Sequence, residues 1–373
     1  AVSDAARERL AIFVVRVADG QIERLTSMDW IRVSNLVWLP DASGLIVVAA
    51  DKSDAVRQLW QVDCPGGNAH RFSRDTDGYG AALSVCAGGN LLAVQIRRES
   101  NIWIAPANNL SSARQVTFSS FNGLYGYNGF DWTPDNRIIF TGGAGRTLAI
   151  YSMDANGGQV EQLTSAGFFG EEPKVTGDGR FIVFQSNHSG SSEIWRVGLN
   201  GRDLHQLTTG GRNLSANTTP DGKWVVYVSS REGRSFVFRV PIDGGEPVRI
   251  TSGESSNPSV SPDGKLIACG YRIGSNAREQ LALVNFEDGA LVRLFDAARS
   301  ASFSDGIRWT PDGRGVCYRD KVAGIWRQDV NGGAPRRLPG LPEEFNYPYS
   351  WSRDGTLFAF TRGRTISDAV LFK

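Results

Sequence analysis

Trp309-Thr310-Pro311-Asp312-Gly313 is the stretch that decides the fold, because copies of it recur along the 373-residue chain. In each copy a strand ends at the turn, often in Trp or Val, and an apolar strand follows. Glycine accepts a positive φ and aspartate hydrogen-bonds nearby backbone amides, so each copy predicts a tight turn between two strands. The turn falls at eight positions: Asp41, Gly88, Asp135, Asp178, Asp221, Asp263, Asp312 and Asp354.

The spacing of these turns predicts the architecture. Successive turns lie between 42 and 49 residues apart. A period in the forties with strand-like content is typical of a β-propeller with one four-stranded blade per repeat. An outer-strand motif such as Gln206-Leu207-Thr208 gives a second, independent count of eight. We therefore predict an all-β, eight-bladed β-propeller of four-stranded antiparallel blades, or seven blades if the weak copy at 85–90 is spurious.

The two ends of the chain carry incomplete repeats. The chain begins with a third and an outer strand, around Ile12-Phe13 and Arg24-Leu25-Thr26, and it ends with an inner, a second and a third strand. We predict that N- and C-terminal strands share one blade, which removes open sheet edges. Because blades bury surface only against their neighbours, a single domain over residues 1–373 is expected. On the third strands we expect three tryptophans to be buried between blades: Trp103, Trp195 and Trp326.

Composition excludes several classes of function. The chain has 40 basic and 39 acidic residues without a basic stripe, so no nucleic-acid binding is expected. No apolar run approaches the length of a membrane span, so no membrane insertion of this chain is expected. The three histidines are scattered and the four cysteines show no metal-binding spacing. We expect no cofactor, no metal, no catalytic residue and a monomeric chain. Cys269 and Cys317 lie in second strands and are expected to be buried thiols.

The loops that join each outer strand to the next inner strand are the candidate binding region. They are aromatic and rich in glycine, and the fold brings them to one rim around the central channel. Residues at the start of inner strands converge below that rim. Glu171 and Glu172 favour a cationic or amine-bearing group, and Tyr127 and Tyr347 could stack on a ligand. The predicted ligand-binding residues are Asn35, Tyr79, Tyr125, Tyr127, Phe168, Glu171, Glu172, Ser215, Asn257, Asp305, Phe345, Tyr347 and Tyr349. The alternative is that these aromatic rings pack between blades around a water-filled channel.

The repeat Trp-Thr-Pro-Asp-Gly, followed by Ile-Trp, Asn-Gly-Gly and Arg-Leu, resembles the TolB-like, WD40-like propeller repeat of bacterial proteins over essentially the whole chain. The end of the chain, residues 358–371, is similar to the C-terminus of propeller modules attached to bacterial serine/threonine kinases and winged-helix regulators.

This resemblance implies a non-catalytic sensor or scaffold module. Such a module would bind a protein, peptide or small ligand at the channel mouth, within a larger bacterial signalling protein. It favours a periplasmic or extracytoplasmic location. The alternative is an enzyme or enzyme-accessory propeller, lyase-like or peptidase-gating, that acts at the central channel. The scarcity of histidine argues against a lyase, and the chain begins at Ala1, so we expect a mature form or an excised fragment.

Overall fold

The computed structural model describes residues 2–4, 9–51, 57–73, 78–118, 124–143, 148–165, 170–231, 233–274, 277–296, 301–303, 306–320, 324–341 and 348–372. The chain divides into two compact units. Unit 1 contains Ala1–Glu99, Ala144–Arg146 and Arg364–Lys373, and unit 2 contains Ser100–Gly143 and Thr147–Gly363. The single domain over residues 1–373 that the repeat predicts stays a prediction.

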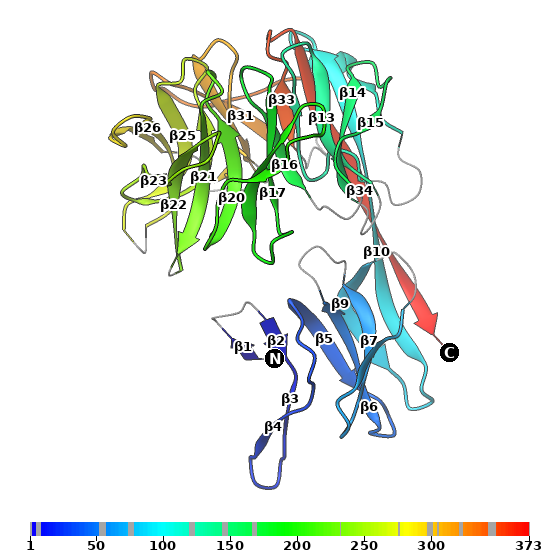
Figure 1. Cartoon of the computed structure of the whole chain (residues 1–373). Helices are drawn as coiled ribbons and strands as arrows, with labels where there is room; N and C mark the ends of the chain where they lie inside the picture. Colours follow the sequence, from blue (N-terminus) through cyan, green and yellow to red (C-terminus); the bar gives the residue numbers. More distant parts are fainter. Residues whose placement is uncertain are drawn as a thin grey trace. The chain divides into compact units, whose positions relative to one another are not determined.

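The described part of the chain is all-β, apart from a three-residue 3-10 helix at Leu110–Ser112. Its strands pair in antiparallel fashion (Figure 1). None of the helical residues described here forms a segment long and apolar enough to cross a membrane. The all-β class predicted from the repeat is therefore confirmed.

Five sheets of unit 2 follow one another along the chain, each built from consecutive strands. The first is β12 (Phe130–Trp132), β13 (Arg137–Gly142), β14 (Ala149–Asp154) and β15 (Glu161–Gln162), and the second is β16 (Glu171–Val175), β17 (Phe181–Ser186), β18 (Glu193–Gly198) and β19 (His205–Gln206). The third is β20 (Arg212–Thr218), β21 (Trp224–Arg231), β22 (Arg234–Pro241) and β23 (Val248–Arg249), and the fourth is β24 (Glu254–Val260), β25 (Leu266–Arg272), β26 (Gln280–Asn285) and β27 (Leu291–Phe295). In the fifth, β28 (Ala301–Ser302) and β29 (Arg308–Trp309) both pair with β30 (Gly315–Asp320), which continues to β31 (Gly324–Asp329) and β32 (Arg336–Arg337).

A sixth sheet joins distant parts of the chain. Its order is β33 (Tyr349–Trp351), β34 (Leu357–Phe372), β10 (Leu91–Pro106) and β11 (Arg114–Gln115). Figure 1 shows the C-terminal β34, in red, beside β10, in cyan. The predicted blade shared by the two chain ends is not confirmed, because β34 pairs with β10 instead of an N-terminal strand. The residues around Ile12 and Leu25 belong to a separate two-stranded sheet.

Unit 1 holds the first copies of the repeat. One four-stranded sheet consists of β5 (Arg32–Trp38), β6 (Gly44–Ala50), β7 (Gln58–Asp63) and β8 (Ala69–Arg71), and β9 (Gly78–Val85) pairs with β10. Two short hairpins precede them: β1 (Val2–Asp4) with β2 (Arg9–Ala11), and β3 (Phe13–Val15) with β4 (Ile22–Arg24). Two of the eight turns, at Asp41 and Gly88, therefore lie in unit 1, and the other six lie in unit 2. The predicted count of eight blades is not confirmed.

The turn motif is explained by its own hydrogen bonds. Asp312 Oδ1 accepts the Thr310 hydroxyl at 2.5 Å and the Arg314 amide at 3.0 Å. The same hydroxyl accepts the amide of Gly315 at 2.9 Å. These bonds satisfy the polar backbone of the turn without help from distant residues. The equivalent Ser or Thr donates to the equivalent Asp at Asp135, Asp178, Asp221, Asp263 and Asp354.

The outer-strand motif has a similar local explanation. The Thr208 hydroxyl accepts the Ile194 amide of β18 at 2.9 Å, and Gln206 Nε2 donates to the Thr208 carbonyl at 2.7 Å. The threonine thus pairs an amide of the third strand at the point where the outer strand ends. The same amide-to-hydroxyl bond is formed by Thr117, Thr164, Thr251 and, in unit 1, Ser73.

Hydrophobic clusters join each sheet of unit 2 to the next. One cluster packs the sixth sheet against the first and contains Ile102, Ala359 and Trp132, whose indole is 0 % exposed. Another packs the fifth sheet against the sixth and contains Ile325 and Phe360. The four remaining joints have equivalent clusters. The prediction of buried third-strand tryptophans is wrong in part: Trp103, Trp195 and Trp326 pack at the margins of these clusters and are only partly buried.

Candidate functional site

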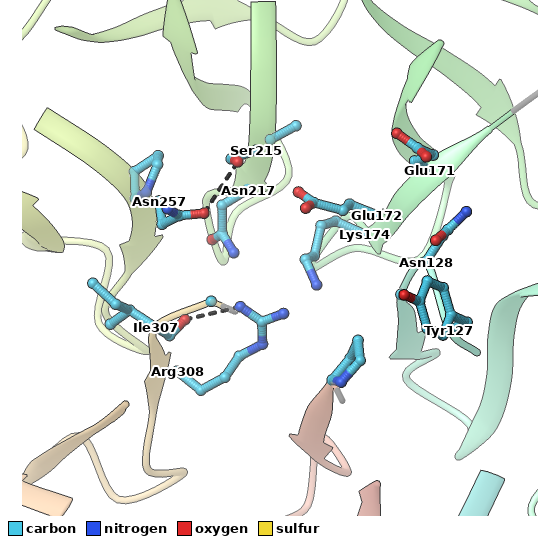
Figure 2. Close-up of a pocket in the computed structure, with 15 residues that line it drawn as sticks. Tyr127, Asn128, Glu171, Glu172, Lys174, Ser215, Asn217, Asn257, Ile307 and Arg308 are labelled. Carbon is cyan, nitrogen blue, oxygen red and sulfur yellow. Dashed lines mark hydrogen bonds between the residues drawn. The ribbon is translucent and has the colours of Figure 1, made fainter. Parts of the chain in front are cut away.

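A cavity of about 260 Å³ lies in unit 2 where the first strands of its sheets begin. Each of the six sheets supplies residues to the cavity lining from the segment around its first strand. The lining residues lie in 127–129, 171–174, 215–217, 257–258, 306–308 and 348. Figure 2 shows the side chains of Lys174, Asn217 and Arg308 directed into this space. Polar groups that converge in a concave site are the usual form of a ligand pocket.

The lining follows the repeat. We call the residues six before the turn aspartate the mouth positions, and those four before it the channel positions. The two sets are two residues apart in each repeat. The mouth positions are Gly129, Glu172, Ser215, Asn257, Gly306 and Pro348, and all six line the cavity. The channel positions are Asp131, Lys174, Asn217, Ser259, Arg308 and Ser350, and they line a second cavity that adjoins the first.

Three mouth positions have a strained backbone. Glu172, Ser215 and Asn257 have φ of 51°, 52° and 48°, in the left-handed region that residues with a side chain rarely adopt. At each of them the pairing with the second strand shifts register, as in a β-bulge. Bulges redirect side chains and are frequent beside functional sites. The Ser215 hydroxyl donates to Asn257 Oδ1 at 3.1 Å, so two neighbouring sheets are linked at the mouth.

Lys174 is the buried charge of the site. Its side chain rises from β16 and the residue is 6 % exposed. Burial is the main cause that lowers the pKa of the Lys174 ammonium to about 8, and the nearby Arg308 charge contributes to the same shift. Asp131 and Glu172 act in the opposite direction but do not offset the burial. Near neutral pH this ammonium is therefore protonated, yet easily deprotonated when the pH rises.

Arg308 faces Lys174 from β29. Its Nη1 donates to the carbonyl of Ile307 at 2.9 Å. Its Nε is buried and has no hydrogen-bond partner among the residues that the structure describes. Figure 2 shows the guanidinium and the Lys174 ammonium directed toward the same space. Two cationic groups thus meet in the cavity.

Other polar groups of the channel hold the strands together. Asp131 Oδ2 accepts the Val175 amide at 2.9 Å and Arg353 Nη2 at 3.3 Å. Arg353 also donates to the carbonyls of Trp132 and Val175, at 3.2 and 2.6 Å. Asn217 Oδ1 accepts the amide of Val260 at 3.2 Å. These side chains link neighbouring sheets, so they are less available to a ligand than Lys174 and Arg308.

The structure brings five of the predicted residues together and places four others elsewhere. The five that line the cavity are Tyr127, Glu171, Glu172, Ser215 and Asn257. The four others are Asn35, Tyr79, Tyr125 and Tyr349. The Asn35 amide donates to the Ala81 carbonyl at 2.6 Å, and Tyr79 is 1 % exposed. Tyr125 packs on Phe140, and Tyr349 stacks on Phe358. Asn35 and Tyr79 belong to unit 1. Phe168, Asp305, Phe345 and Tyr347 lie outside the described residues. A binding role for any of these residues stays a prediction.

Sequence reasoning missed Lys174, Asn217 and Arg308. They lie in the inner strands themselves, whereas the prediction considered the loops and the first residues of those strands. The signal was present in the repeat, since Arg308 directly precedes Trp309 in the turn motif and Lys174 stands at the same distance from its own turn. A charged residue inside a short strand that starts a blade marks a side chain directed into the channel.

One family model and several known proteins match this chain. Residues 97–298 match the family described as the TolB beta propeller domain. An uncharacterized protein of Agrobacterium fabrum is 33 % identical over 78 residues, which is 21 % of this chain and 27 % of that protein. The chain thus matches just over a quarter of the length of this curated relative.

Two solved structures share the fold. A candidate TolB from Agrobacterium tumefaciens has a TM-score of 0.57 at 21 % identity, covering 72 % of this chain and 99 % of that one. TolB from Acinetobacter baumannii has a TM-score of 0.51 at 18 % identity, covering 89 % of this chain and 81 % of that one. Because the family match spans more than half of its residues, this chain belongs to the TolB beta propeller domain family.

Proposed function

We propose that this chain is a non-catalytic binding module whose ligand, a protein segment or peptide, enters the cavity of unit 2 at the mouth positions. The observation that carries the proposal is the gathering of Tyr127, Glu171, Glu172, Ser215 and Asn257 around one cavity. Glu172, Ser215 and Asn257 were predicted from the repeat as positions where inner strands begin, whereas Tyr127 was predicted from an aromatic loop and Glu171 as the carboxylate beside Glu172. A tyrosine beside polar side chains suits a peptide, which offers both apolar groups and hydrogen-bonding amides.

We further propose that the six sheets of unit 2 form a closed propeller. The hydrophobic cluster between the sixth and first sheets supports this arrangement. So does the indole of Trp132 on β12, which donates to the Ser350 carbonyl of β33 at 3.3 Å. A closed ring would hold the mouth positions rigidly, and a rigid scaffold lowers the entropy lost on binding.

The wider setting follows from the resemblance to propellers attached to bacterial kinases and winged-helix regulators. On that basis we propose that the chain acts as a sensor or scaffold within a larger bacterial signalling protein, in a periplasmic or extracytoplasmic location. The competing function is an enzyme or enzyme-accessory propeller that acts at the same channel. A binding module releases its ligand chemically unchanged, whereas an enzyme releases a product.

Peptide display against the purified chain tests the proposal. Selected peptides are synthesised and their dissociation constants are measured for wild type, Tyr127→Ala and Asn257→Ala, both of which line the cavity. We expect each substitution to weaken binding about tenfold, or ~1.4 kcal/mol. Glu246→Ala, at an exposed position, is the control and should bind as wild type.

Two results would contradict the proposal. One is wild-type affinity in both cavity variants together with a loss of binding in Glu246→Ala, because the ligand would then bind elsewhere. The other is chemical change of the selected peptide during incubation, seen by mass spectrometry, because that would favour the enzyme.

A further inference from the structure

We propose that the cavity of unit 2 binds a carboxylate group between the Lys174 ammonium and the Arg308 guanidinium. This inference rests on the proposed function and names the ligand chemistry that the site accepts. The carboxylate could belong to the C-terminus or an acidic side chain of a peptide, or to a free small monocarboxylate.

The first support is the burial of Lys174. Moving an ammonium out of water is costly unless it is paired and hydrogen-bonded. At 6 % exposure Lys174 has lost nearly all of its water, and among the described residues no hydrogen bond or ion pair of its side chain is found. It lines both cavities of the channel, so its three donors can be reached by a ligand.

The second support is the arrangement of Arg308. Its buried Nε lacks a hydrogen-bond partner in the described part of the chain. The positive charge of Arg308 repels the positive charge of Lys174. Two like charges that share a cavity repel each other, and an anion between them turns this repulsion into attraction. A guanidinium presents a planar fork of donors that fits the two oxygens of a carboxylate, while an ammonium adds a flexible third contact.

The third support comes from the acidic groups near the site, which are largely engaged elsewhere. Asp131 accepts the Val175 amide and Arg353. Glu171 accepts Gln185 Nε2 at 3.2 Å, and Figure 2 shows its side chain turned away from Arg308. Glu172 remains beside Lys174 and acts on it through charge. Its negative charge disfavours a ligand with several charges, so a monocarboxylate fits better than a phosphate.

Isothermal titration calorimetry with matched probes tests the inference. The probes are a display-selected peptide with a free C-terminus, the same peptide with an amidated C-terminus, and sodium propionate. The variants are Lys174→Met, Arg308→Gln and Arg308→Lys, with the exposed Lys223→Met as the control. Circular dichroism melts confirm that each variant is folded.

We expect the charge-removing variants to bind a carboxylate probe at least about tenfold more weakly, since hydrogen bonds to charged groups are the strong ones. Arg308→Lys keeps the charge without the fork and should lose less, whereas Lys223→Met should bind as wild type. Loss of peptide binding on amidation identifies the C-terminus as the source. Binding of both peptide forms, with competition by propionate, identifies an acidic side chain. Propionate binding alone identifies a free monocarboxylate.

A pH readout separates this role from a structural one. The charged groups that face Lys174 are Asp131, Glu172, Arg308 and Arg353. Because its pKa lies near 8, the wild type should bind the carboxylate more weakly as the pH rises through that value. At pH 8 to 9, binding should take up a proton, detected as an enthalpy that varies with the buffer. Lys174→Met should abolish that uptake. Even if this variant does not fold, the proton uptake of the wild type still tests the inference.

Several results would overturn the inference while the proposed function stands. Equal affinity for the free and amidated peptides without competition by propionate is one, and wild-type affinity in Lys174→Met and Arg308→Gln is another. Stronger binding of amine-bearing probes, lost in Glu172→Gln, would mean that the cavity selects a cation. If no peptide binds at all but propionate does, the proposed peptide ligand is wrong and the carboxylate site remains.

Discussion

Replacing Trp132 by alanine should lower the free energy of unfolding by about 3 to 5 kcal/mol, as for other fully buried aromatic residues. The indole is 0 % exposed and packs at the joint between the sixth and first sheets of unit 2. Truncation leaves a cavity there and also leaves the Ser350 carbonyl without its indole donor. Trp132→Phe keeps most of the volume and should lose about 1 to 3 kcal/mol, mainly for the unpaired carbonyl.

The repeat supplies a matched control. Trp38 stands at the same distance before its turn in unit 1, but it is 46 % exposed. Trp38→Ala should therefore change stability by less than about 0.5 kcal/mol. Guanidinium titrations followed by far-ultraviolet circular dichroism give the free energies without relying on tryptophan fluorescence. If Trp132→Ala loses no more than Trp38→Ala, the joint between β33 and β12 does not hold unit 2 together and the closed arrangement is wrong.

Buried thiols, a buried carboxylate and the turn aspartates each predict a measurable result. Burial raises the pKa of the Cys269 thiol to about 12 and also raises the pKa of the Cys317 thiol. A thiol reagent should therefore modify the exposed Cys86 in the folded protein, but Cys269 and Cys317 only after unfolding. Fast reaction of both buried thiols in the folded protein would contradict this. Glu193, which is 1 % exposed, accepts hydrogen bonds from Thr208 and Asn213, so Glu193→Ala should lose about 2 to 3 kcal/mol in urea titrations, and a loss well below 1 kcal/mol would mean that these donors find water. The Thr310 hydroxyl lowers the pKa of Asp312 below its usual 3.8, so the stability that this turn provides is complete above pH 3.8 and is lost as the pH falls below it. Between about pH 4 and pH 2 the wild type should therefore lose more stability than Asp312→Asn. Equal losses in the two proteins would contradict a stabilising role of this hydrogen bond.

The parts of the fold that were predictable are those that local hydrogen bonds determine. The turn at Asp312 and the outer strand at Thr208 satisfy their own polar groups, so each copy has a signature in the sequence. Which strand pairs with the C-terminal β34 is not a local matter. The segment around Ile12 and the strand β10 carry similar third-strand patterns, and the choice between them depends on the packing of Ile102 and Ala359 against the first sheet.

The candidate site was predictable to the same extent. Counting back from the turns located Glu172, Ser215 and Asn257 at one mouth, because strand geometry fixes where those residues lie. Aromatic rings are ambiguous, since a tyrosine near a rim can face a ligand or the core, and Tyr349 stacks on Phe358. Lys174 was missed because the prediction considered the loops and the first residues of the strands, although its distance from the turn is the same as that of Arg308.

Photo-crosslinking tests the proposed binding site most directly. The chain is made with p-benzoylphenylalanine in place of Tyr127, and separately in place of Leu204, which is 46 % exposed and does not line the cavity. Each form is irradiated with a display-selected peptide, and adducts are located by mass spectrometry. Binding at the mouth positions predicts adducts from position 127 that an excess of unlabelled peptide removes, and none from position 204. Adducts from position 204 alone, or equal adducts from both positions, would contradict it.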